Sequence, residues 1–158
     1  PDAARTQPAE RTRRVTRLAV VPQNTAGLHQ QARSRRVYEL HGSIYRNHCL
    51  SCGKGFSAEY IQKSTGVPRC ECGGIIKPDV VLYGEQLDEN TILGAVRAIA
   101  AADLLIVAGT SLSVYPAASF LSYFRGEHLV LINRDKTPLD GACELVIHEK
   151  AGEVFSTL

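Results

Sequence analysis

The sequence has no long apolar run and no strong excess of charge of one sign. No apolar run approaches the roughly 20 residues that a helix needs to cross a bilayer, so we expect no membrane association. A secretory signal peptide, an internal repeat and a low-complexity linker are also missing. A net charge of +2 over 158 residues favours no class of partner. We therefore expect an intracellular, cytoplasmic protein of one domain, or of a domain with a small insert.

Aromatic residues are missing from the stretch in which cationic residues gather. The arginines cluster near the start of the chain: Arg5, Arg11, Arg13, Arg14, Arg17, Arg33, Arg35 and Arg36. A nucleic-acid-binding surface usually pairs such cations with aromatic side chains that stack on bases. The pattern therefore favours a helix face in solvent, and nucleic acid is not an expected partner. A zinc ribbon that binds nucleic acid, with Lys54, Lys63 and Lys77 adding charge, stays open as a third interpretation.

Four of the five cysteines stand in two close pairs, Cys49 with Cys52 and Cys70 with Cys72. Zinc takes four tetrahedral ligands, and thiolates are among its preferred donors. A disulfide framework is the alternative, but a bridge between residues only two apart would be strained. We predict one structural zinc ion bound by all four thiolates, which leaves no ligand position for water. The lone Cys143 is interpreted as a small buried hydrophobic residue.

The second half of the chain alternates between helical and strand-like patterns. Asp88 can cap a helix that ends near residue 102, with Ile92, Val96 and Ile99 on one apolar face. Three apolar runs predict strands: 104–108, 129–132 and 145–148. Two more helices are expected at 116–124 and from 151 onward. The continuous run 104–108 is typical of a strand buried on both faces. This order predicts an α/β fold with a parallel sheet covered by helices.

The first half gives weaker signals. Short strands are predicted at 18–21 and 37–40, and residues 1–17 show only a weak helical pattern. A small helix is expected at 58–63, and residues 79–85 are expected to be extended.

Polar segments follow several of the predicted strands, and ligands of open α/β sheets bind beyond the carboxyl ends of the strands. These segments are Gln23 with Asn24, and residues 39–43, 109–111 and 133–135. Gly109 lets backbone approach a ligand closely, and Asn133 offers a donor and an acceptor to a ribose or base. Each segment alone is also explained by an ordinary turn or by packing. Their joint occurrence favours a nucleotide site.

Several short motifs occur together from about residue 18 to the end. They are Gln-Asn at 23–24, Glu-Leu-His-Gly-Ser at 39–43, the four cysteines, Lys-Pro-Asp-Val-Val-Leu-Tyr-Gly-Glu at 77–85, Gly-Thr-Ser-Leu at 109–112, Val-Tyr-Pro-Ala at 114–117 and Ile-Asn at 132–133. With them the chain resembles the sirtuins, NAD-dependent protein lysine deacylases, in their small bacterial form. The resemblance implies a Rossmann-like parallel sheet, incomplete at its N-terminal part (1–43 and 77–158), with an inserted zinc-ribbon module (44–76).

The resemblance also implies an activity. The acyl group of an acyl-lysine protein or peptide would pass to the ADP-ribose part of NAD, and nicotinamide would be released. His41 would act as the general base toward a ribose hydroxyl, and Asn24 would orient the ribose and the attacking water. The implied NAD contacts are Gln23, Asn24, Ala26, Gly109, Thr110, Ser111, Asn133, Arg134 and Asp135. The implied substrate contacts are Val81, Tyr83, Gly84, Glu85 and Val114, with the peptide added as a strand.

The chain departs from the sirtuin pattern in two places. We expect it to correspond to about the C-terminal two-thirds of the family's catalytic domain, because the family's glycine-rich phosphate loop and Pro-Asp-Phe-Arg segment are not found in it. Where the family has Thr-Gln-Asn-Ile-Asp, residues 22–26 end in Ala26, which cannot supply the carboxylate that helps to hold the nicotinamide amide. A truncated or degenerate, non-catalytic module that binds zinc or peptide is therefore the alternative.

Overall fold

The computed structural model describes residues 18–110 and 117–157, and these fall into two compact units. The parallel-sheet unit consists, among the described residues, of 18–21, 28–38, 89–110 and 117–157. The cysteine unit consists of 22–27 and 39–88. Among the described residues, no helix is both long and apolar enough to cross a membrane. The weak helical pattern at 1–17 lies outside the described residues.

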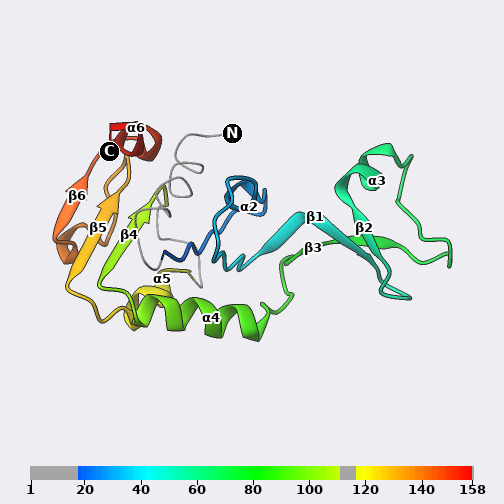
Figure 1. Cartoon of the computed structure of the whole chain (residues 1–158), viewed down its shortest axis with the longest axis horizontal. Helices are drawn as coiled ribbons and strands as arrows, with labels where there is room; N and C mark the ends of the chain where they lie inside the picture. Colours follow the sequence, from blue (N-terminus) through cyan, green and yellow to red (C-terminus); the bar gives the residue numbers. More distant parts are fainter. Residues whose placement is uncertain (1–17, 111–116, 158) are drawn as a thin grey trace. The chain divides into compact units, whose positions relative to one another are not determined.

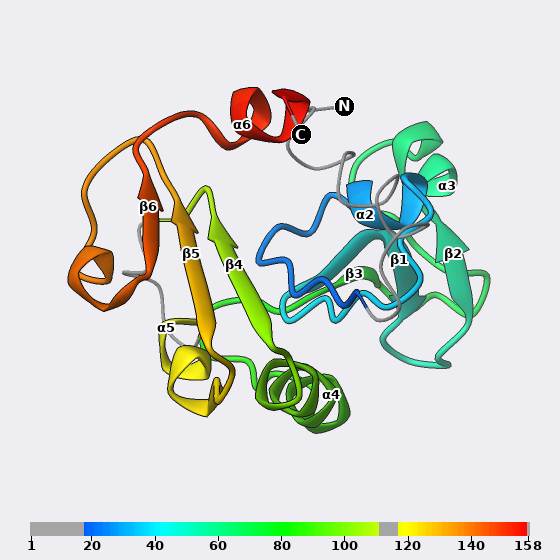
Figure 2. The same ribbon diagram turned by 60° about the vertical axis from the view of Figure 1, so that its left-hand side comes forward.

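The parallel-sheet unit is built on three strands, β4 (Leu104–Ala108), β5 (His128–Ile132) and β6 (Leu145–Ile147). They pair in the order β4-β5-β6, and both pairings are parallel. Figures 1 and 2 show the three strands side by side and pointing the same way, so their carboxyl ends share one edge. The α/β class and the three apolar runs predicted as strands are confirmed.

The burial of these strands is uneven. Leu131 in β5 is fully buried, and Ile132 in β5 and Val107 in β4 are also buried. Leu104 and Ile106, however, are 49% and 42% exposed. The prediction that residues 104–108 are buried on both faces is therefore wrong. Successive side chains of a strand point to opposite faces, and the described residues cover only the face of β4 that bears Val107.

The helices of this unit follow the predicted pattern with shifted ends. The helix α4 (Glu89–Ala100) begins directly after Asp88 and buries Ala95 and Ile99 on the predicted apolar face. The helix predicted at 116–124 is shorter: α5 (Ala117–Phe120) passes into a 3-10 helix, η1 (Leu121–Tyr123), while Pro116 lies outside the described residues. The remaining helices are α2 (Leu28–Gln31), η2 (Asp140–Ala142) and α6 (Ala151–Thr157), the last at the predicted position.

The strands predicted at 18–21 and 37–40 are wrong in extent, because these segments share only one parallel bridge, between Val20 and Val37. Two backbone hydrogen bonds make it, from Val20 N to Arg36 O and from Tyr38 N to Val20 O, both 2.9 Å. Tyr38, the residue after Val37, packs on α4 and does not extend the strand pairing. A Cβ atom at Gly94 would lie 2.3 Å from the Tyr38 ring, so the helix needs glycine at this contact.

The cysteine unit contains a small antiparallel sheet in the order β2-β1-β3. Its strands are β1 (Gly42–Cys49), β2 (Gly55–Ser57) and β3 (Ile76–Val80). The helix α3 (Ala58–Lys63) has the predicted bounds, and Ser57 caps it by accepting a hydrogen bond from Tyr60 N. A hydroxyl at this position satisfies one of the free amides of the first turn, which explains why the helix begins here.

The prediction that residues 79–85 are extended throughout is wrong. β3 ends at Val80, and a turn follows in which Glu85 N donates to Leu82 O at 3.0 Å. Gly84 has φ +84°, which favours glycine, and the Glu85 carboxylate accepts from Leu82 N. These local contacts bend the chain within the segment that was predicted to be extended.

Candidate functional site

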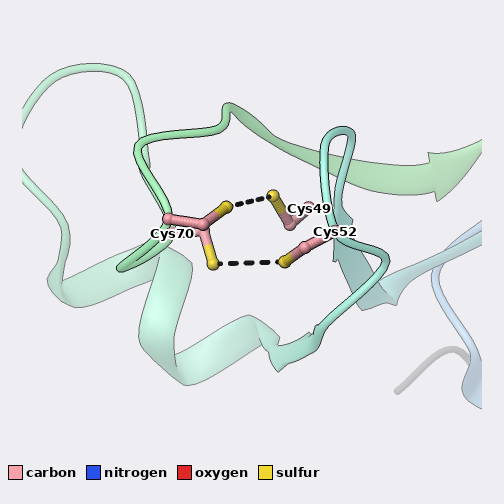
Figure 3. Close-up of side chains that lie close together, drawn as sticks. Cys49, Cys52 and Cys70 are labelled. Carbon is pink, nitrogen blue, oxygen red and sulfur yellow. Dashed lines mark hydrogen bonds between the residues drawn. The ribbon is translucent and has the colours of Figure 1, made fainter.

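The four paired cysteines meet at one point, at the end of β1, in the loop before β2 and in the turn before β3. Their sulfur atoms all lie within 4.8 Å of one another. Cys49 and Cys72 are 3.5 Å apart at sulfur, and Cys52 and Cys70 are 3.6 Å apart, which is too far for disulfides. Figure 3 shows the labelled Cys49, Cys52 and Cys70 pointing toward this common centre.

Backbone amides shape the thiol cluster. The Cys52 backbone amide, together with that of Ser51, lowers the pKa of Cys49 to about 6 against the effect of burial. The Gly74 amide lowers the pKa of Cys72, but hydrogen bonds with the other three thiols outweigh it and raise that pKa to about 12. A divalent cation bound at this centre would displace the thiol protons. Four sulfur donors fit zinc and leave no position open to water.

Two tight loops bring the sulfurs together. Gly53 N donates to Cys49 O and Gly73 N to Cys70 O, and both glycines have positive φ angles of 72° and 84°. Gly74 faces the centre itself, where a Cβ atom would lie 2.6 Å from the Cys49 sulfur. The lone Cys143 lies elsewhere in the sequence and is half-buried, and burial raises the pKa of its thiol.

The same unit positions His41 in a tight turn. Gly42 N donates to Glu39 O at 3.0 Å, and the carbonyl of His41 accepts from Val81 N at 3.1 Å. The half-buried imidazole lies 3.0 Å, through Nδ1, from the backbone carbonyl of Gln23. Because a carbonyl only accepts, Nδ1 carries the proton in this contact. The neutral ring therefore keeps its lone pair on Nε2.

The loop 22–27 lies against the start of β1. Ile44 N donates to Thr25 O at 3.1 Å, and a Cβ atom at Gly27 would meet the Tyr45 ring at 2.8 Å. This contact brings the predicted residues Gln23, Asn24 and Ala26 into the same unit as His41. Asn24 is exposed, whereas Gln23 and Ala26 are half-buried.

The turn after β3 carries four of the predicted substrate contacts. Val81 binds the His41 carbonyl, and Tyr83 stands at the tip with its side chain fully exposed. Lys77 closes the turn, since its Nζ donates to Val80 O at 2.9 Å and to the Glu85 carboxylate at 3.0 Å. The Leu82 amide and Lys77 both lower the pKa of Glu85.

The carboxyl ends of the parallel strands carry the other predicted residues. Gly109 N donates to Ile132 O at 2.9 Å and Asn133 N to Ile147 O at 3.1 Å, so the residues after β4 and β5 lie at one edge. Gly109 has φ +64°, and a Cβ atom added to it would meet no described atom within 4 Å, so conformation rather than space requires glycine there. Thr110 follows, half-buried, while Ser111 and Val114 lie outside the described residues.

The segment after β5 is fixed by residues that sequence analysis missed. His148 Nδ1 donates to Asn133 O at 3.0 Å, and its Nε2 lies 3.1 Å from the Asp140 carboxylate. The amide and hydroxyl of Thr137 donate to Asp140 and lower its pKa. Within the segment, the Asn133 side chain donates to Asp135 O. The prediction placed His148 inside the strand 145–148, whereas β6 ends at Ile147 and leaves His148 in the segment that follows.

Arg134 and Asp135 contribute least to this edge. They pair with each other at 3.4 Å, and about three-quarters of each side chain is exposed. The described residues thus place the predicted site in two groups, one around His41 and one at the sheet edge.

The comparisons with known proteins agree with the motifs. The family model described as "Sir2 family" matches residues 8–116. The chain belongs to the Sir2 family. The resemblance to sirtuins is thereby confirmed. This Sir2-family chain is 56% identical over 142 residues to an NAD-dependent protein deacetylase of Clostridium acetobutylicum, covering 89% of the chain and 58% of that protein.

Two further comparisons extend this result. A Cutibacterium acnes protein of the same description is 53% identical over 139 residues, which cover 88% of this chain and 57% of that protein. A solved structure described as "Sir2-p53 peptide-NAD+" matches with a TM-score of 0.89 and 34% identity, over 99% of this chain and 68% of that one. The Sir2-family chain therefore spans less than two-thirds of the length of the two bacterial relatives.

Proposed function

We propose that this chain is part of an NAD-dependent protein lysine deacylase, which transfers the acyl group from lysine to the ADP-ribose portion of NAD and releases nicotinamide. The two bacterial relatives are named as NAD-dependent protein deacetylases, and the solved relative is described with NAD+ and a p53 peptide. The observation that carries the proposal is the orientation of His41 in a Sir2-family chain.

His41 has the geometry of a general base. Its Nδ1–H is held by the Gln23 carbonyl at 3.0 Å, which fixes the tautomer and leaves Nε2 as the proton acceptor. With Nε2 as the acceptor, the imidazole can take a proton from a ribose hydroxyl and return it later. Asn24, next to Gln23, would orient the ribose and the attacking water. When bound, NAD supplies the ribose carbon that loses nicotinamide.

The nucleotide would be held by residues from two separate parts of the sequence. We assign Gly109, Thr110, Ser111 and Asn133 to the phosphate and ribose contacts, since amides and hydroxyls after strand ends suit such oxygens. Arg134 and Asp135 are assigned to the same edge. Gln23 and Ala26 would face the nicotinamide end, where Ala26 offers no carboxylate.

The turn after β3 would bind the substrate. Tyr83 is fully exposed at a tip that Lys77 and Glu85 hold in place, so its ring is free to contact a ligand. We assign Val81 and Tyr83 to the acyl-lysine, and the backbone of Gly84, Glu85 and Val114 to an added strand of the peptide.

The remaining assignments concern the metal and the setting. The zinc ion would stabilise the fold rather than take part in the reaction, because four sulfur atoms complete its coordination. We place the protein in the cytoplasm, since a four-thiolate site depends on reduced cysteines and reducing compartments maintain them. The domain boundaries, 1–43 with 77–158 and 44–76, stay part of the proposal.

The test is nicotinamide release by the whole protein in the presence of an acetyl-lysine peptide. We expect release that depends on the peptide, and we expect His41→Ala to abolish it. The control is His128→Ala, which removes an exposed histidine paired with Glu144 outside the assigned site. Undiminished turnover by His41→Ala would reject the role given to this residue.

The alternative is a non-catalytic module, and binding of NAD to the 158-residue chain itself discriminates between the two. Tight binding, measured by calorimetry, would count against the module. Nucleic-acid binding by the cysteine unit has less support, because its three lysines are paired with carboxylates. These pairs are Lys54 with Glu71, Lys63 with Glu59 and Lys77 with Glu85.

A further inference from the structure

The position of His41 depends on the turn that carries it. Glu39 is the first residue of this turn and Gly42 the last, joined by a hydrogen bond of 3.0 Å. Gly42 has φ +75°, and a Cβ atom there would lie 1.8 Å from the backbone oxygen of Asp79. The turn is thus pressed directly onto β3. A contact that holds Glu39 in place therefore also fixes the position of the His41 backbone.

The side chain of Glu39 is largely buried, and it meets an Arg46 side chain that is 55% exposed. The Glu39 side chain is 7% exposed, which makes it the most buried acid among the ion pairs of the described residues. A buried carboxylate is costly unless a counter-charge and hydrogen bonds accompany it. Arg46 supplies both, because its Nη1 donates to the Glu39 carboxylate at 2.8 Å.

Arg46 reaches Glu39 from an irregular part of β1. Ser43 faces Asp79 and Asn47 faces Pro78, so the residues between them form a bulge without partners on β3. From this bulge, the Nε of Arg46 lies 3.8 Å from the Asp79 carboxylate. One guanidinium therefore links the bulge to the His41 turn on one side and to β3 on the other.

We propose that Arg46 and Glu39 form a positioning pair for His41. Arginine suits this task because its planar fork can bind two carboxylates in fixed directions. Neither residue needs to touch the reacting atoms, since the pair acts by holding the backbone on which the imidazole stands. The catalytic consequence rests on the proposed function, whereas the structural consequence does not.

The test compares Arg46→Gln with Lys63→Gln in the whole protein. The control variant removes an exposed ion pair of the same unit, Lys63 with Glu59. We expect kcat with an acetyl-lysine peptide to fall by about tenfold or more in Arg46→Gln, because a displaced base reacts slowly, with the KM for NAD changed by less than about twofold. We expect faster hydrogen exchange at the amides of Gly42 and Val81, which bond to the turn.

Two further variants keep the result interpretable. Glu39→Gln combined with Arg46→Gln removes the orphaned charge and restores a neutral pair, so we expect it to recover most of the amide protection. Arg46→Lys keeps the charge without the fork and should give an intermediate loss. If Arg46→Gln does not fold, the comparison of Arg46→Lys with Lys63→Gln replaces it.

The outcomes separate this inference from the proposed function. Loss of protection at Gly42 and Val81 in Arg46→Gln, but not in Lys63→Gln, supports the positioning pair even if the unsubstituted protein shows no deacylase activity. Unchanged protection overturns it, including the case in which kcat falls, because the loss of activity would then arise elsewhere. Unchanged kcat in an active protein also overturns the catalytic part.

Discussion

The two units differ in what fills their interiors. In the cysteine unit, the buried cluster consists of Cys49, Cys70 and Ile76, with Phe56 and Ile61 packed against it, and Leu40 is also buried. In the parallel-sheet unit, the buried hydrophobic residues that the structure describes include no cysteine: Ala95, Ile99, Val107, Phe120, Leu131 and Ile132. A small sheet that uses thiols as core residues has little apolar surface with which to fold alone. The comparison indicates that one unit is stabilised by a metal ion and the other by packing.

Removing a metal ligand tests this difference most strongly. We expect Cys70→Ser to lose zinc and to unfold the cysteine unit while the parallel-sheet unit keeps its structure, because binding of structural zinc contributes on the order of 10 kcal/mol. Elemental analysis gives the zinc content, and amide NMR spectra report each unit separately. The matched control, Cys143→Ser, should keep one zinc ion. A zinc ion retained by Cys70→Ser would refute the assigned ligand set.

Creating a cavity in the other unit should have the second largest effect. Leu131 is fully buried in the central strand, so Leu131→Ala should lower the free energy of unfolding by about 2–5 kcal/mol without changing zinc content. The exposed Leu104 in β4 provides the control, since Leu104→Ala removes little buried surface. Denaturant titration of both variants measures the difference, and equal losses would contradict the observed burial.

A change in the loop 22–27 should have a smaller effect, on binding rather than on folding. Ala26→Asp restores a carboxylate where the sirtuin pattern has one, and we expect NAD to bind the whole protein more tightly by about 1–3 kcal/mol. Calorimetry measures the affinity. Thr25→Asp places the same charge one residue away and should not give this gain. Equal affinities for all three proteins would remove Ala26 from the site.

The smallest expected effect concerns Lys77 and Glu85. Because the Leu82 amide and Lys77 lower the pKa of Glu85 from its ordinary 4.5, the turn gains stability above that pH and loses it as pH falls through the lower, folded-state pKa. An NMR titration of the Glu85 carboxyl carbon should give a midpoint below 4.5. Lys77→Met should raise this midpoint, and Lys63→Met should leave it unchanged. No response to Lys77→Met would show that the pair is not formed in solution.

Local signals in the sequence predicted much of the fold. The helix at 58–63 was predicted with its observed bounds, and the structure adds the Ser57 cap that begins it. The strands at 104–108, 129–132 and 145–148 were found from continuous apolar runs. The four cysteines were recognisable as a metal site, because zinc constrains the type and spacing of its ligands more than most sites do.

Contacts between distant residues were not predictable in the same way. The segments 18–21 and 37–40 were predicted as strands, yet they share only one bridge, and Tyr38 contacts Gly94 of α4. The pairing of Glu39 with Arg46 depends on a bulge, and the contact of His148 with Asn133 depends on the alignment of two strands. Neither a bulge nor a strand alignment is marked by residue type alone.

The bulge in β1 also affects how strictly the number of residues between His41 and Cys49 is fixed. Side chains alternate along a strand, so in a regular strand the loss of one residue would rotate every later side chain to the opposite face. Here the register shift between Ser43 and Asn47 interrupts the pairing of β1 with β3. It lies between the end of β1 next to His41 and the end that carries Cys49. Insertions within it should therefore be absorbed locally, which would let relatives vary the spacing from histidine to first cysteine without reorienting either one.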